Sequence, residues 1–204
     1  SIYLYIHLFN IQLSIMSIID LIRSRKSPYC FDGTPVQLDE IKTAFEAAQW
    51  AASAYNAQPW RFVYAAAQTE DFETLKSFAI PFNQNWLQFA GGIGAIMART
   101  TSEHNGEPDP SAVYCTGLAM GQFSVELTAL GLDMHQLSAF DAGALKTKLD
   151  LPESFEPIAM MGIGRGGAAE NTPTELREME EGRANRERKP LTDLVKAVGD
   201  VFSA

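Results

Sequence analysis

The chain has 204 residues, of which 46% are hydrophobic and 20% charged, a composition typical of a globular domain and unlike that of disordered or fibrous proteins. Its 16 Lys and Arg residues against 25 Asp and Glu give a net charge of −9, which disfavours binding to nucleic-acid phosphates. Cys30 and Cys115 are the only cysteines, so we expect no disulfide framework and a reducing, cytoplasmic location.

The first 19 residues carry no Asp, Glu, Lys or Arg. They lack the positive start and small-residue cleavage site of a secretory signal, and polar residues interrupt them too often for a membrane span. We expect residues 1–15 to be an apolar extension that precedes a natural start at Met16, and residues 16–204 to form a single domain. The alternative is that residues 1–15 form an apolar arm that packs against a partner subunit.

The chain then alternates between helical and extended patterns. Ser17 and Asp20 have the spacing of a capping box, which begins a short helix that ends before Pro28. Hydrophobic periodicity predicts, in chain order, a helix over 39–52, strands over 61–66 and 91–98, helices over 113–130 and 141–149, a strand over 157–163, and helices over 175–184 and 191–202. This order, without repeats or linkers, predicts one α/β or α+β domain.

Positive charge is concentrated in two short segments. Seven of the 16 cations lie in residues 23–26 and 183–189, namely Arg23, Arg25, Lys26, Arg183, Arg186, Arg188 and Lys189. Arginine forks bind phosphate oxygens in pairs, and the hydroxyl of Ser27 adds a donor, so the two segments are candidates for one anion pocket. The alternative is two solvated faces, because glutamates interleave with the second segment.

Residues 51–62 form a second candidate region. Small residues at a helix end are followed by Asn56 and Gln58, and Pro59 then breaks the chain before a strand. Small side chains leave room for a flat ligand, and the two amides offer the paired donors and acceptors that a pyrimidine-dione edge requires. The alternative is a plain helix–strand loop around a buried Trp60.

Taken together, these blocks resemble the nitroreductase family of FMN-dependent flavoproteins. The resemblance begins with Arg25-Lys26-Ser27 and Phe31 and continues with Ser53-Ala-Tyr-Asn-Ala-Gln-Pro-Trp60. Three later blocks follow in the family's order: Asn83-Gln-Asn-Trp86, Phe140-Asp141 and Arg186-Glu-Arg188-Lys-Pro-Leu191. The resemblance implies an α+β, nitroreductase-like fold with a central mixed β-sheet flanked by helices. It also implies an intertwined homodimer with FMN at the subunit interface.

The resemblance also implies roles for individual residues. Arg25, Lys26 and Ser27 would hold the FMN phosphate and ribityl chain, and Arg186 and Arg188 would close on the same phosphate. The remaining expected cofactor-binding residues are Ser53, Ala54 and Asn56, contributed by the partner subunit, Gln58 of the same loop, Asn83 at the pyrimidine edge, and the backbone of Ser138 and Ala139 near the reactive flavin nitrogen.

The activity implied is a ping-pong transfer of hydride from NADH or NADPH, through the flavin, to a small-molecule acceptor such as a nitro compound or quinone. No catalytic side chain is expected, because the flavin carries the chemistry. The alternatives are a flavin-storage protein with little turnover, or a specialised member such as an enone reductase or dehalogenase. Two departures from the family pattern are Tyr29, where many relatives have a cation, and Trp86, where some have a lysine.

Other motifs are weaker. Gly162-Ile-Gly-Arg-Gly-Gly167 matches a dinucleotide fingerprint but precedes no apolar helix, so we interpret it as a strand that runs into a loop. The three histidines are scattered, so no metal site is expected. Glu178, Glu180 and Glu181 are interpreted as a solvated helix face paired with Arg177 and Arg183.

Overall fold

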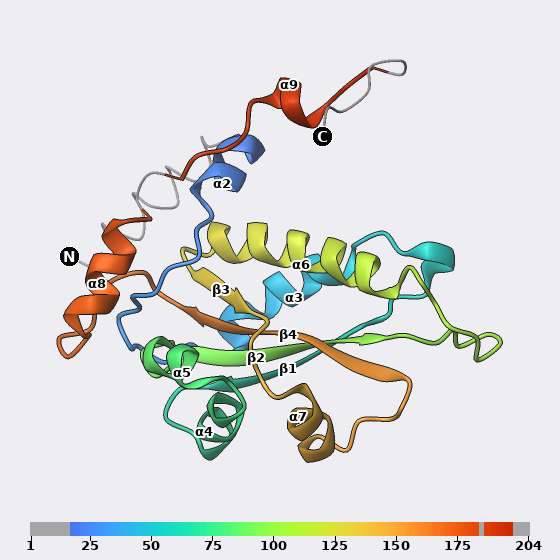
Figure 1. The fold of residues 1–204 in the computed structure, drawn as a ribbon, viewed down its shortest axis with the longest axis horizontal. Coiled ribbons are helices and arrows are strands. Elements are labelled where there is room, and N and C mark those ends of the chain that lie inside the picture. The colour runs from blue at the N-terminus through green and yellow to red at the C-terminus, as the bar shows by residue number, and fades with distance from the viewer. Residues whose placement is uncertain (1–16, 184–185, 198–204) are drawn as a thin grey trace.

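The computed structural model describes residues 17–183 and 186–197, which fold around a four-stranded sheet (Figure 1). The strands are β1 (Trp60–Ala66), β2 (Gly92–Arg99), β3 (Asp133–Leu137) and β4 (Phe155–Gly164), in the spatial order β1-β2-β4-β3. The expected sheet flanked by helices is confirmed. Its three described pairings are all antiparallel, whereas the resemblance implied a mixed sheet.

Helices cover both faces of the sheet. Those described are α2 (Ile18–Ser24), α3 (Lys42–Gln49), α4 (Glu70–Ser77), α5 (Pro81–Leu87), α6 (Ala112–Ala129), α7 (Ala142–Lys148), α8 (Thr174–Glu181) and α9 (Leu191–Leu194), with short 3₁₀ turns at Leu38–Ile41 and Ala54–Asn56. The α3 and α6 helices pack together on one face, and α4 and α7 lie on the other (Figure 1). The segment from Arg186 to α9 runs beside α2 (Figure 1).

Most predicted elements are present, with changed boundaries. The helix expected over 39–52 begins as a 3₁₀ turn and ends at Gln49, and the helix expected over 191–202 ends at Leu194. Part of that second range, 198–202, lies outside the described residues, as do residues 1–15. The sequence patterns missed α4, α5 and β3. The edge strand β3 is only five residues long and carries polar side chains, so its alternation is too short to stand out.

The apolar core is divided between the two faces of the sheet, and β4 contributes to both. Glycines in β4 let large side chains lie directly on its backbone: a Cβ at Gly162 would lie 2.7 Å from a ring carbon of Trp86, and one at Gly164 would lie 2.8 Å from Phe31. Trp86 and Phe31 are fully buried. Trp86 is therefore a core residue, and it holds α5 against the sheet.

No helix among the described residues is both long and apolar enough to cross a bilayer.

Candidate functional site: a basic cavity between residues 24–27 and 180–188

The two cation-rich segments lie side by side. The guanidinium group of Arg186 donates hydrogen bonds to the backbone carbonyls of Arg23 and Arg25, and that of Arg183 donates to the carbonyl of Ser27 at 2.8 Å. These contacts join positions more than 150 residues apart. Together the segments enclose a basic cavity of about 670 Å³, lined by Ser24, Arg25, Lys26, Ser27, Glu180, Glu181, Arg183, Arg186 and Arg188.

Three guanidinium groups of this basic cavity form no ion pair with any carboxylate that the structure describes. Arg25, Arg186 and Arg188 belong to none of the ion pairs found within residues 17–183 and 186–197. Burial lowers the pKa of Arg25, and the neighbouring charges of Arg186 and Arg188 lower it further. The charge of Asp133 opposes this shift. Three cations held close together repel one another. A bound anion would remove that repulsion.

Two carboxylates near the basic cavity, those of Asp133 and Glu180, are already engaged. Lys26 pairs with Asp133 at the start of β3, at 3.4 Å. Burial raises the pKa of Asp133, and Lys26 opposes that shift. Glu180 accepts hydrogen bonds from the backbone N–H groups of Tyr29, at 2.6 Å, and Cys30, at 3.3 Å. The expectation that Glu180 lies on a solvated helix face is therefore wrong: its carboxylate attaches α8 to the 29–30 backbone.

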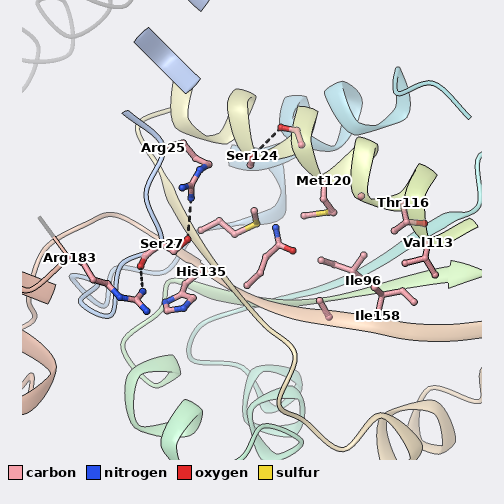
Figure 2. A pocket seen from close by; sticks show the side chains of 15 residues that line it. Arg25, Ser27, Ile96, Val113, Thr116, Met120, Ser124, His135, Ile158 and Arg183 are labelled. Carbon is pink, nitrogen blue, oxygen red and sulfur yellow. Dashed lines mark hydrogen bonds between the residues drawn. The ribbon is translucent and has the colours of Figure 1, made fainter. Parts of the chain in front are cut away.

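Strand β3 extends from the basic cavity along a second cavity of about 650 Å³, which shares Arg25, Ser27 and Arg183 with the first. Figure 2 shows Arg25, Ser27, His135 and Arg183 at one end, with Ile96, Val113 and Ile158 toward the other. The ring of His135 stacks on Trp86, with centroids 4.5 Å apart. Its Nδ1 lies 2.8 Å from the carbonyl oxygen of Pro28, so Nδ1 carries the hydrogen and donates it. Burial lowers the pKa of His135.

Three more of the predicted residues gather beyond the end of β3. The Asn83 side chain donates to the backbone carbonyl of Ala139, at 3.2 Å, and accepts from the indole N–H of Trp86, at 3.1 Å. Asn83 is buried, and Ser138 and Ala139 are exposed. The amide of Asn83 thus fixes α5 against the 138–139 backbone, and one hydrogen and one lone pair remain for any ligand.

The loop that contains Ser53, Ala54, Asn56 and Gln58 lies elsewhere in the chain. Its backbone is tightly folded, because Tyr55, Asn56 and Gln58 all have φ between 46° and 57°, a region rarely adopted by residues other than glycine. Ser53 Oγ accepts a hydrogen bond from the backbone N–H of Gln58 at 3.0 Å. Ala54 lines a separate cavity of about 760 Å³ with residues 99–111. Within one chain, the structure does not bring this loop to the basic cavity.

The model of the nitroreductase family matches residues 22–165 of the chain. The chain belongs to the nitroreductase family. The match covers the Arg25 segment, the 53–58 loop and strands β1 to β4, and it ends before α8 and the segment that supplies Arg183 and Arg186.

Individual members of the nitroreductase family agree with this assignment. The Bacillus subtilis (strain 168) protein YodC, named as an NAD(P)H nitroreductase, is 20% identical over 72% of this chain and 88% of its own length. A crystal structure described as an oxidoreductase containing FMN is 29% identical, covers 89% of this chain and 90% of its own, and superposes with a TM-score of 0.78. A nitroreductase from Desulfovibrio desulfuricans, solved with FMN, is 20% identical over 88% of this chain and 95% of its own, with a TM-score of 0.68.

Two residues that line these cavities are not among the expected cofactor-binding residues. Arg183 belongs to the second basic segment and is also interpreted from the sequence as a partner of the α8 glutamates, and its guanidinium lines both cavities. His135 is one of the three scattered histidines, and it lines the cavity beside β3. The signal for Arg183 was its place in a basic segment. No local pattern signalled His135, because its neighbours Trp86 and Pro28 are far away in the sequence.

Proposed function

We propose that this protein is an FMN-dependent oxidoreductase that takes hydride from NADH or NADPH and reduces a small-molecule acceptor such as a nitro compound or quinone. The observation that carries the proposal is the convergence of Arg25, Arg186 and Arg188 on one cavity, where none of them forms an ion pair with a carboxylate of the described residues. The FMN-containing structure that resembles this chain, at 29% identity over most of both chains, supports the choice of cofactor.

The donor set fits the phosphate of FMN. Arginine forks and the hydroxyl of Ser27 offer several hydrogens to phosphate oxygens, and each bond to a charged group contributes about 1.5–3 kcal/mol. From this cavity, β3 leads to Ser138 and Ala139, which are exposed. Its five residues span about 17 Å, a length comparable to that of an extended FMN molecule. The flavin ring would then lie near residues 138–139 and Asn83.

When bound, FMN would supply the two-electron chemistry that links a hydride donor to the acceptor. The chain's own residues bind and orient it. Arg25, Lys26 and Ser27 would fix the phosphate, with Arg186 and Arg188 closing the cavity over it. One remaining hydrogen of Asn83 is available to the pyrimidine edge, where a fixed donor would stabilise negative charge on the reduced ring.

The exposed face of α6 supports the proposal of a homodimer. Val113, Tyr114 and Leu118 are exposed there, with 70% of Tyr114 accessible. Among the described residues, and apart from the backbone of α6 itself and the adjoining residues, no atom lies within 4 Å of a Cβ built at Gly117 or Gly121. Exposed apolar helix faces of this kind are typical of subunit interfaces. In a dimer, the second subunit could also bring its 53–58 loop to the flavin, whereas the loop of the same chain lies away from the basic cavity.

The test is the visible spectrum of the purified protein, recorded before and after anaerobic addition of NADH and of NADPH. Flavin absorbance that bleaches identifies the reductase and its preferred donor. A yellow protein that neither nucleotide bleaches favours the alternative of a storage protein. A colourless protein that does not bind added FMN contradicts the proposal.

A further inference from the structure

We propose that Arg183 is a further anion-binding residue of the basic cavity and that the ring of Tyr29 holds it in position. This inference rests on the proposed function, since the anion is taken to be the phosphate of FMN. It adds a cation from the end of α8 to those expected at Arg25, Arg186 and Arg188. It also gives a role to Tyr29, which stands where many relatives have a cation.

The guanidinium group of Arg183 is held by three contacts. Its central carbon lies 4.0 Å from the centroid of the Tyr29 ring, within the range of a cation–π interaction. Nη2 donates to the hydroxyl of Tyr29 and Nη1 to the carbonyl of Ser27, each at 2.8 Å. An arginine has five N–H hydrogens, so two bonds leave three for a ligand.

The platform beneath Arg183 is itself fixed. Tyr29 is only 8% exposed, and its backbone N–H is bound by Glu180. Its ring packs against His135, with centroids 4.8 Å apart, and His135 in turn stacks on the buried Trp86. The order from core to cavity is therefore Trp86, His135, Tyr29 and Arg183. A guanidinium held in this way loses little conformational entropy when it binds an anion.

The surroundings leave the charge of Arg183 available. Within residues 17–183 and 186–197, no carboxylate forms an ion pair with it. Glu180 and Glu181 also line the basic cavity, and the carboxylate of Glu180 is used by two backbone N–H groups. Arg183 lines the cavity together with Arg25 and Ser27. The free N–H hydrogens of Arg183 are therefore available to the same ligand as the donors of Arg25 and Ser27.

The test compares FMN with riboflavin, which has the same ring and ribityl chain but no phosphate. The dissociation constants for both flavins are measured by flavin fluorescence. Four apoproteins are compared: the wild-type protein and the variants Arg183→Ala, Arg183→Lys and Tyr29→Phe. Arg183→Ala should raise the Kd for FMN roughly 10- to 100-fold and that for riboflavin less than about 2-fold, since one charged contact to phosphate is lost. Arg183→Lys should recover only part of this loss, because lysine lacks the planar fork.

Tyr29→Phe should weaken FMN binding a few-fold by removing one positioning bond, and should add nothing in the Arg183→Ala background. The control is Arg23→Ala: this side chain is largely exposed, lines neither cavity, and carries the same charge nearby. It should leave both Kd values unchanged. Equal losses for FMN and riboflavin in Arg183→Ala would overturn the inference, because they would show only a structural clamp.

Failure of the proposed function is distinguishable from failure of this inference. If the wild-type protein binds neither flavin, the anion-binding role of Arg183 can still be tested. The measurement is the thermal stabilisation by inorganic phosphate, compared with chloride at equal ionic strength. Stabilisation that Arg183→Ala abolishes would support an anion site without FMN. Absence of stabilisation in the wild-type protein would overturn both proposals.

Discussion

Replacing Arg25 by alanine should separate the binding of FMN from the stability of the fold. The variant loses one charged partner of the phosphate, which costs about 1.5–3 kcal/mol and raises the Kd for FMN roughly 10- to 150-fold. In the apoprotein the changes oppose one another. The 3.1 Å hydrogen bond from Arg25 to Ser27 is lost, while the repulsion from Arg186 and Arg188 is relieved. For a chain of this size 1 kcal/mol shifts Tm by about 2–4 °C, so the apoprotein Tm should move by no more than a few degrees.

Isothermal titration of apoprotein with FMN, together with thermal unfolding of the apoprotein, measures both quantities. Arg23→Ala is the matched control, since its side chain lines neither cavity. A loss of FMN affinity confined to Arg25→Ala, with little change in apoprotein Tm, is the expected result. If Arg25→Ala binds FMN as tightly as the wild-type protein, the phosphate does not lie at Arg25 and the assignment of the basic cavity is wrong.

Three other predictions concern the histidine, the sheet and the subunit interface. Burial lowers the pKa of His135 from its ordinary value of 6.5, so the unfolded chain binds a proton more readily and the fold loses stability as pH falls below 6.5. The His135→Asn variant should lose less unfolding free energy over the same pH range, as measured by urea unfolding. Gly162→Ala places a Cβ 2.7 Å from Trp86 and should cost about 1–3 kcal/mol of unfolding free energy, whereas Gly143→Ala, with its nearest atom at 3.6 Å, should cost none. Gly121→Arg, in open space on α6, should leave the monomer folded but abolish a dimer in sedimentation; an intact dimer would contradict the α6 interface.

Much of the fold could be predicted from local patterns. The periodicity of apolar residues located α3, α6, α7 and the strands β1, β2 and β4, because each buries one stripe or both faces against the core. The patterns failed where an element is short or polar. The α4 helix carries a Thr69 N-cap followed by acidic residues, a helix-start signal from which the sequence analysis did not predict a helix. The β3 strand has only five residues.

The site was predictable in part. Charge concentration identified both basic segments, and their contact across more than 150 residues is now seen at Arg186 and Arg183. What no local pattern encodes is the order of packing beneath them. The stack from Trp86 through His135 to Tyr29 depends on tertiary contacts between α5, β3 and the 27–30 segment. Whether the 53–58 loop binds the same flavin depends on a second chain, and that remains a prediction.

A crystal structure of the protein with FMN tests the account most directly. The account predicts phosphate oxygens within hydrogen-bonding distance of Arg25, Arg183 and Arg186. It also predicts a flavin ring near Ser138 and Ala139, and the partner subunit's 53–58 loop against that ring. A phosphate located outside the basic cavity, or a flavin bound by one chain alone, would contradict it.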